Sequence, residues 1–243
     1  MAEEKTKLTQ EEKLQLLLSK HQRDINRMKD SDKATRKRGL EKLLSDLPWE
    51  KKSNRKAFCV LFQEHLLKSL LDAMNDSVEK CRDISHKIIK QALAAFPALS
   101  TDTVRAIVES FCARVNDVPF PEPTEELRLM VLQVLRDTLV HESCRANAEL
   151  CRDLCVHVVT ALARACTDGF PAAKREAADL LCIAVSASPE PWTLAGSLKT
   201  CLKGLCANAM HQHNKVRGAT LRAVLAAVSC FDADYQSVMR EQL

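Results

Sequence analysis

Arginines recur along this 243-residue sequence at nearly constant intervals, and this repeat constrains the fold more than any other feature. The five arginines are Arg36, Arg82, Arg128, Arg175 and Arg217, and the steps between them are 46, 46, 47 and 42 residues. Each arginine follows a short polar break and lies near the start of a stretch with apolar residues at helical spacing. Each break also ends another such stretch, so the sequence predicts a two-helix unit that is repeated along the chain.

A two-helix unit that recurs every ~40–47 residues is typical of HEAT and armadillo arrays. We therefore predict an all-α protein, a right-handed α-solenoid of about five HEAT-type helix pairs. The predicted units are about 9–47, 53–96, 101–141, 147–187 and 192–230, followed by the start of a sixth at 232–243. Because each repeat buries its apolar stripe only against its neighbours, we expect residues 1–243 to form a single solenoid rather than separate domains.

The composition supports helices and excludes several classes of enzyme. Five glycines and eight prolines are too few for the turns of a β-sandwich or barrel, and only 4% of the residues are aromatic although 46% are hydrophobic. Neither a G-x-G-x-x-G nor a G-x-x-x-x-G-K-[ST] motif occurs, which excludes the Rossmann and P-loop types of nucleotide site. No run of about 18 apolar residues predicts a membrane span. We expect no cofactor and no enzymatic activity.

Acidic residues in the polar breaks suggest a structural ladder. In the second unit Asp76 precedes Arg82, which places a carboxylate in the turn and a guanidinium just inside the second helix. A guanidinium is a planar fork that suits bridging to carboxylates or carbonyls of the next repeat. The third and fifth units have Asn116 and Asn214 where an acid is expected, so we expect interruptions there. The predicted ladder residues are Asp32, Arg36, Asp76, Arg82, Arg128, Asp168, Arg175 and Arg217.

Eleven cysteines and seven histidines raise the question of a metal or thiol site. Cys151, Cys155 and His157 lie on one predicted helix, with the two cysteines one turn apart. Cys201 and Cys206 lie on another predicted helix. A structural zinc site pairs a C-x₂₋₄-C element with a second one at defined spacing, and the sequence has none. We therefore interpret the cysteines as small, reduced core residues and expect neither a metal site nor a catalytic residue.

Four segments resemble the amino-terminal HEAT repeats of the dynein axonemal assembly factor 5 family in sequence, order and spacing. They are HLLKSLLDAMNDSVEKCRDI, EELRLMVLQVLRD, TDGFPAAKREAADLL and HQHNKVRGATLRAVLAAV, and the resemblance covers roughly residues 30–231. The most specific piece is the H-Q-H-x-K-V-R stretch at His211–Arg217. Members of that family are much longer chains, so the resemblance implies an amino-terminal part of such a chain or a shortened relative.

The resemblance implies a function, partners and a location. It implies a cytoplasmic factor without enzymatic activity that assists the preassembly of ciliary dynein arms, with the cilium or axoneme as a further location. The implied partners are dynein intermediate and heavy chains, other assembly factors and co-chaperones. On this interpretation the chain is a protein-binding scaffold, and we expect neither a nucleic acid nor a membrane as a partner.

The turns inside the repeats supply a candidate partner edge, which consists of Phe120, Phe170, His211 and His213. In a two-helix solenoid such turns line one edge. Phe120 stands between prolines, which pre-order the loop and reduce the entropy lost when a partner docks. An exposed aromatic side chain would then anchor the partner. The alternative is that both phenylalanines pack back between adjacent helices.

The excess positive charge lies in the first quarter of the chain and supports a second hypothesis. Residues 1–56 contain 16 Lys and Arg against 10 Asp and Glu, whereas the whole chain contains 36 against 32. The basic residues cluster at 36–38 and 51–56. The alternative function is a HEAT domain that uses this region to bind tubulin or microtubules, or that acts as a transport adaptor. Interleaved acids favour a solvated helix face instead.

Overall fold

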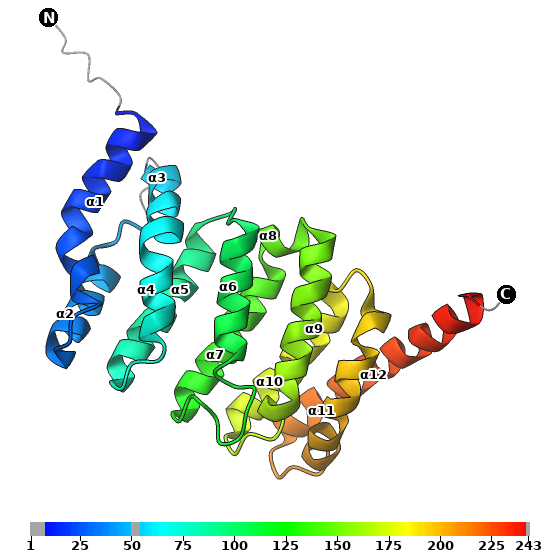
Figure 1. Ribbon diagram of the computed structural model, residues 1–243. Helices are drawn as coiled ribbons and strands as arrows, with labels where there is room; N and C mark the ends of the chain where they lie inside the picture. The colour runs from blue at the N-terminus through cyan, green and yellow to red at the C-terminus, as the bar shows by residue number, and fades with distance from the viewer. Residues whose placement is uncertain (1–7, 50–53, 242–243) are drawn as a thin grey trace, which may run out of the picture. The chain divides into compact units, whose positions relative to one another are not determined.

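The computed structural model describes residues 8–49 and 54–241 of the chain. The chain divides into two compact units, residues 1–99 and 100–243, and each is described by itself (Figure 1). Every regular element in the described residues is helical, and successive helices pack against one another in pairs. The prediction of an all-α solenoid is confirmed. That the repeats form one uninterrupted array over the whole chain stays a prediction.

The first unit contains two helix pairs. Thr9 starts the first helix with a capping box, because its hydroxyl accepts the N–H of Glu12 at 3.2 Å and the Glu12 carboxylate accepts the N–H of Thr9 at 2.7 Å. The elements are α1 (Gln10–Arg27), α2 (Lys33–Asp46), α3 (Arg55–Val60), the π-helical segment η2 (Leu61–Leu66), α4 (Leu67–Ala73) and α5 (Glu79–Ala95). α3, η2 and α4 follow one another without a loop. The predicted start of the second helix pair, Ser53, lies outside the described residues.

Close packing defines the core of the first unit. The ring of Phe58 lies edge-on to Trp49 and Phe96, with centroids 4.9 and 5.1 Å apart, a favourable geometry for aromatic pairs. α1 and α2 approach closely at Gly39, where an added Cβ would lie 2.7 Å from the Cβ of Arg27. This contact between the two helices therefore requires glycine.

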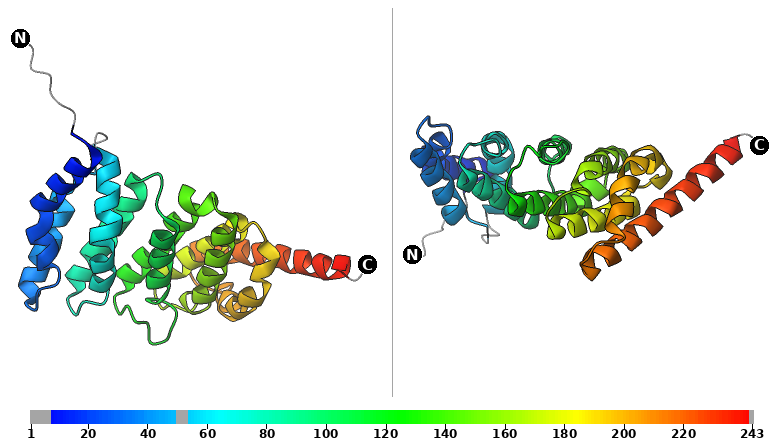
Figure 2. Two further views of the ribbon diagram at one scale, coloured as in Figure 1. Left: turned by 45° about the horizontal axis from the view of Figure 1, so that its top comes forward. Right: turned by 90° about the horizontal axis from the view of Figure 1, so that it is seen from below.

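The second unit contains three helix pairs in two layers. α6, α9 and α11 lie side by side in one layer, and α7, α10 and α12 lie in the other (Figure 1); Figure 2 shows the two layers from a second direction. The elements are α6 (Thr101–Cys112), α7 (Glu125–Val140), α8 (Glu142–Arg145), α9 (Ala148–Ala165), α10 (Pro171–Ala187), η3 (Pro191–Leu194), α11 (Ala195–Asn208) and α12 (Asn214–Glu241).

The end of α12 differs from the prediction. Residues 232–241, expected to start a sixth repeat, continue α12 without a break. The pair of aspartates at 232 and 234 was a weak break signal, since no glycine or proline follows Gly218 to end the helix. α12 also presents an exposed apolar stripe at Leu221, Leu225 and Val228.

The cores contain mainly aliphatic side chains and thiols. Eight of the eleven cysteines are buried: Cys81, Cys112, Cys144, Cys151, Cys155, Cys166, Cys201 and Cys230. Each behaves as a small apolar side chain between helices. Within the described ranges, no helix has the length and apolar character needed to cross a bilayer.

Candidate functional site

The turn inside each repeat contains the same hydrogen bonds. One residue per turn, which we call the turn acceptor, accepts through its side chain the backbone N–H two residues later, at 2.8 to 3.1 Å. The turn acceptors are Asp30, Asp76, Glu122, Asp168 and His211. Their spacing is 46, 46, 46 and 43 residues. In four of the turns an arginine six residues later donates Nη1 to the backbone carbonyl of the turn acceptor, at 2.8 to 3.2 Å. These arginines are Arg36, Arg82, Arg128 and Arg217.

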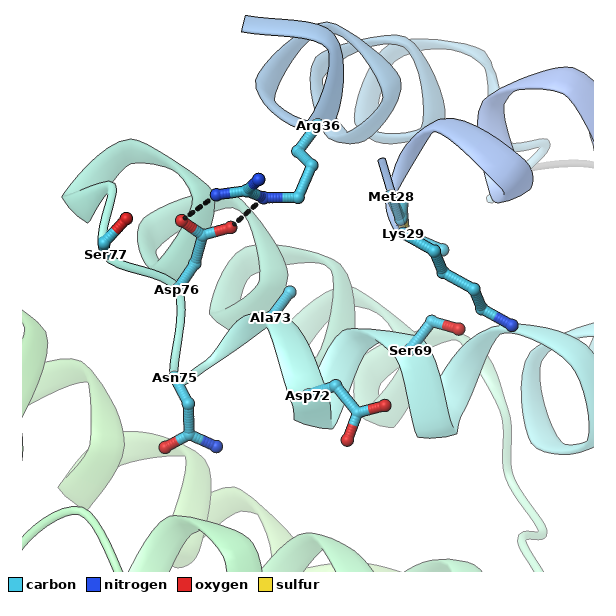
Figure 3. A pocket seen from close by; sticks show the side chains of 9 residues that line it. All are labelled: Met28, Lys29, Arg36, Ser69, Asp72, Ala73, Asn75, Asp76 and Ser77. Atoms are coloured by element: carbon cyan, nitrogen blue, oxygen red, sulfur yellow. Dashed lines mark hydrogen bonds and ion pairs between the residues drawn. The ribbon is translucent and has the colours of Figure 1, made fainter. Parts of the chain in front are cut away.

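In the first unit, Arg36 on α2 also reaches the next turn acceptor, Asp76 (Figure 3). Its Nε donates to Oδ2 at 2.6 Å and its Nη2 donates to Oδ1 at 2.9 Å. This bidentate pair lowers the pKa of Asp76 and raises the pKa of Arg36. Arg82, which follows this carboxylate in the sequence, donates to the backbone carbonyl of Asp76. We call such a link between successive turns a rung.

A groove of about 450 Å³ lies beside this rung. Figure 3 shows that its wall combines the end of α4, the turn that follows it and the turn after α1. The lining residues are Met28, Lys29, Arg36, Ser69, Asp72, Ala73, Asn75, Asp76 and Ser77. Because the groove contains the carboxylates of two aspartates, it has no excess of positive charge.

The second unit contains a more buried rung between Arg128 on α7 and Asp168 in the turn before α10. The guanidinium donates to the carboxylate at 2.6 and 2.9 Å, and the two side chains are only 10% and 2% exposed. The pair raises the pKa of Arg128. Arg128 also donates to the carbonyl of Pro123 at 2.8 Å, and its Cζ lies 4.8 Å from the ring centroid of Phe120. A guanidinium over an aromatic face is a cation–π contact.

The loop between α6 and α7 has its own internal support. Arg114 donates to the carbonyl of Pro121 at 2.7 Å and to the carboxylate of Glu122 at 3.2 Å. Glu122 is fully buried, and the peptide bond between Val118 and Pro119 is cis. These contacts hold the loop against the unit while the side chain of Val118 is 59% exposed.

Two predicted ladder residues were wrong. Asp32 is the N-cap of α2, because its carboxylate accepts the N–H of Thr35 at 2.8 Å, and the turn acceptor is Asp30. Arg175 lies one residue past the ladder position, which Lys174 occupies. Arg175 lies 47 residues after Arg128, whereas the constant spacing of 46 residues falls on Lys174.

The predicted interruptions were also placed at the wrong residues. Asn116 does not interrupt the third turn, because Glu122 is the turn acceptor there. In the fifth turn the departure lies at His211 rather than at Asn214. Glu122 lies 46 residues after the turn acceptor that precedes it and His211 lies 43 residues after its own, so the repeat spacing indicates both positions.

The four candidate edge residues lie in three turns of the second unit. Phe120 is half-buried, and the guanidinium of Arg128 covers part of its ring. Phe170 is half-buried and precedes α10 directly. His211 and His213 precede α12, and their ring centroids are 5.3 Å apart.

Three buried thiols meet where α8 packs against α9. Cys144, Cys151 and Cys155 are at most 2% exposed, and Cys151 donates to the carbonyl of Ala187 at 3.3 Å. Hydrogen bonding to Cys151, together with burial, raises the pKa of Cys144 and Cys155. Among residues 8–49 and 54–241, no group of three or more His, Cys, Asp or Glu side chains could hold a metal ion. The three side chains are part of the buried core, where they fill space between the helices.

The sequence matches a family described as "Dynein axonemal assembly factor 5-like, TPR repeats" over residues 27–239. A Xenopus laevis protein named dynein axonemal assembly factor 5 is 27% identical over 200 residues, which are 82% of this chain and 23% of the relative. The Mus musculus protein of the same name is 28% identical over 162 residues, which are 65% of this chain and 18% of the relative. The chain thus spans less than a quarter of the length of these curated relatives.

Solved structures with a similar fold include repeat proteins. The crystal structure of an engineered protein matches with a TM-score of 0.58 at 14% identity, covering 91% of this chain and 86% of that protein. An archaeal HEAT-like repeats protein from Thermococcus onnurineus NA1 matches with a TM-score of 0.52 at 14% identity, covering 90% and 76%. At this identity the likeness shows the fold alone. The 46-residue spacing of the turn acceptors fits HEAT repeats better than TPR repeats, whose period is about 34 residues.

The extent of the family match, rather than any one motif, decides the assignment. Residues 27–239 include all five turn acceptors, from Asp30 to His211, and both rungs. The chain belongs to the dynein axonemal assembly factor 5-like family.

Proposed function

We propose that the chain is part of a non-enzymatic, cytoplasmic protein-binding scaffold that assists the preassembly of axonemal dynein arms for motile cilia. The observation that carries this proposal is the family match over residues 27–239, because relatives of this chain are named for axonemal dynein assembly. The proposed partners are dynein intermediate and heavy chains, other assembly factors and co-chaperones. The cilium or axoneme is a second proposed location.

The rigidity of the turns supports a scaffold. Each rung ties one turn to the next through a bidentate ion pair, and the buried Arg114–Glu122 pair holds the loop between α6 and α7. A surface that is already ordered loses less conformational entropy when a partner binds. Stacked repeats also provide a long, repeated surface, which solenoid proteins use for binding.

Capture from ciliating cells tests this proposal. The full chain, tagged and expressed in multiciliated cells, should enrich dynein intermediate and heavy chains from the cytoplasmic fraction. The exposed Val118 lies in the turn that precedes α7, and the exposed Val140 ends the same helix. Val118→Asp should reduce capture several-fold, because it places a charge on the proposed edge, whereas Val140→Asp should leave capture unchanged.

Two results would contradict the proposal. If no dynein chain is enriched over an untagged control, the role in dynein assembly is wrong. If both valine variants reduce capture equally, the turns do not form the binding edge. Circular dichroism of each purified variant checks that the helices remain intact.

The microtubule alternative gains no support from the basic region. Arg36 is engaged in a rung, and Lys37 lies 3.7 Å from the carboxylate of Glu41. Lys51 and Lys52 lie outside the described residues. Microtubule co-sedimentation separates the two functions: we expect no pelleting of the chain, and salt-sensitive pelleting would favour the alternative.

A further inference from the structure

The last rung position of the second unit holds two residues that cannot form the pair seen elsewhere. Lys174 takes the place of the rung arginine, and His211 takes the place of the acid. His211 keeps the turn geometry, because its Nδ1 accepts the N–H of His213 at 3.1 Å. In the neutral ring the proton is then on Nε2, so Nε2 can donate a hydrogen bond but cannot accept one. This rung lacks its carboxylate.

The positive charge around His211 has no acidic counterpart in this rung. Partial desolvation and the positive charges of Lys174, His213 and Arg217 together lower the pKa of His211. Within the part of the chain that the structure describes, the Lys174 ammonium forms no hydrogen bond or ion pair. The preceding rung is different, because there a carboxylate neutralises the guanidinium.

A basic groove continues from this turn along α10 and α12. Two hollows of about 350 Å³ each share Arg175, Asn214 and Lys215 as lining residues. The side chains of Arg175 and Lys215 form no hydrogen bond or ion pair with other described residues, whereas Arg222 pairs with Asp179 at 2.8 Å. Glu176, next to Arg175 in sequence, pairs with Arg136 on α7.

None of the described residues that line the two hollows is acidic. We call the surface the open-rung groove. It consists of Arg175, His213, Lys215 and Arg222, which line the hollows, together with Lys174 and His211 of the incomplete rung, which are close to Arg175 and His213 in the sequence. Lys215 and His213 are exposed, and Arg175 is half-buried, so a ligand can reach their polar groups.

We propose that the open-rung groove binds an acidic segment of a partner protein, one of whose carboxylates takes the place that Asp76 and Asp168 take in the intramolecular rungs. The rungs described above already display this chemistry, since each joins a cation to a carboxylate of the next turn. Further carboxylates of the segment pair with Arg175 and Lys215 along the groove. The inference rests on the proposed function in taking the partner to be a protein.

A nucleic acid fits the groove less well. Single-stranded nucleic acids bind where aromatic side chains stack on bases beside a basic track. No Phe, Tyr or Trp is among the described residues that line the two hollows. The experiment therefore includes an oligonucleotide as a competing ligand.

Direct binding of a defined peptide tests the inference. The probe is a fluorescein-labelled decapeptide of alternating glutamate and serine, and its control has glutamine in place of glutamate. Fluorescence anisotropy with the purified chain should show binding of the glutamate peptide alone, and high salt should weaken it. The double variant Arg175→Gln with Lys215→Gln should weaken binding by about tenfold or more. The double variant Lys199→Gln with Lys203→Gln removes the same charge from exposed positions on α11 and should stay within about twofold.

A second variant places the missing carboxylate inside the protein. His211→Asp should also weaken peptide binding by about tenfold, because the new side chain completes the rung with Lys174. It should keep the melting temperature, since aspartate is the turn acceptor in three other turns. Gln212→Asp introduces the same charge on the adjacent exposed residue and should have a smaller effect.

Three results would overturn the inference: equal binding of the two peptides, equal losses in the groove variants and in the α11 control, or tighter binding of oligothymidylate with the same sensitivity to the variants. Failure of the proposed function gives a different result. A chain that binds the glutamate peptide but captures no dynein chain contradicts only that function. A chain that captures dynein chains but binds no peptide overturns only the open-rung groove.

Discussion

Replacing Asp168 with alanine removes the carboxylate from the most buried rung and leaves its guanidinium partner in place. The Asp168 side chain is 2% exposed and accepts three hydrogen bonds, two from Arg128 and one from the N–H of Phe170. The Arg128 side chain is 10% exposed, so water reaches little of it. The variant therefore leaves a nearly buried positive charge without its partner.

The size of the effect follows from this burial. Breaking a buried ion pair by removing one partner costs about 3–5 kcal/mol, because the remaining charge stays desolvated. One kcal/mol corresponds to about 2–4 °C in the melting temperature of a domain of this size. We therefore expect Asp168→Ala to lower the melting temperature by about 6–20 °C.

Urea unfolding followed by far-ultraviolet circular dichroism measures the free energy of unfolding. Asp168→Asn is the matched control, because an amide keeps the shape and one acceptor but loses the charge; we expect a loss of about 1–3 kcal/mol. A double-mutant cycle adds Arg128→Ala and the combined variant. The combined variant should lose less than the sum of the two single losses, by about 0.5–3 kcal/mol.

Two outcomes would refute this reasoning. A loss below about 1 kcal/mol for Asp168→Ala would mean that water or another group satisfies the guanidinium, contrary to the buried geometry. Additive losses in the cycle would mean that the two side chains are not energetically coupled, and the rung would then be a contact without consequence for stability.

Three further predictions concern stability. Gly39→Ala should cost about 1–3 kcal/mol in urea unfolding, because the added Cβ would lie 2.7 Å from the Cβ of Arg27. The pKa of Asp76 is lowered from its ordinary value of 3.8, so its rung stabilises the fold fully above that pH and is lost as the pH falls through the folded-state pKa; acid titration of Asp76→Asn should show a smaller fall in stability. Phe120→Ala should cost about 0.5–2 kcal/mol in urea unfolding, because Arg128 loses its cation–π partner; an unchanged midpoint would show that the contact contributes nothing.

The helices and their pairing could be predicted because their signals are local. Apolar residues at helical spacing mark each buried face, and caps such as Thr9 with Glu12 mark the starts. The repeat period added the order of the pairs. The end of α12 could not be placed in this way, since aspartates near residue 232 resemble a break but nothing in the backbone requires one there.

The rungs were harder to predict because each joins side chains 40 residues apart. Some polar breaks contain more than one acid, and only the folded turn selects the one that can accept the N–H two residues later. Asp32 and Asp30 illustrate this choice, since both are acidic but one caps a helix and the other is the turn acceptor. His211 is not acidic, so only its position in the repeat indicates that it is the turn acceptor.

The buried thiols make it possible to measure local opening at many positions along this chain. A thiol reacts with an alkylating reagent only when it reaches solvent, so the labelling rate of a buried cysteine measures the local opening of the helices around it. Cys206 is exposed and sets the rate for free access, whereas Cys112 and Cys166 are almost fully buried and burial raises the pKa of each. Because the cysteines are spread from residue 59 to residue 230, mass spectrometry of labelled peptides would rank the repeats by opening rate without any engineered probe.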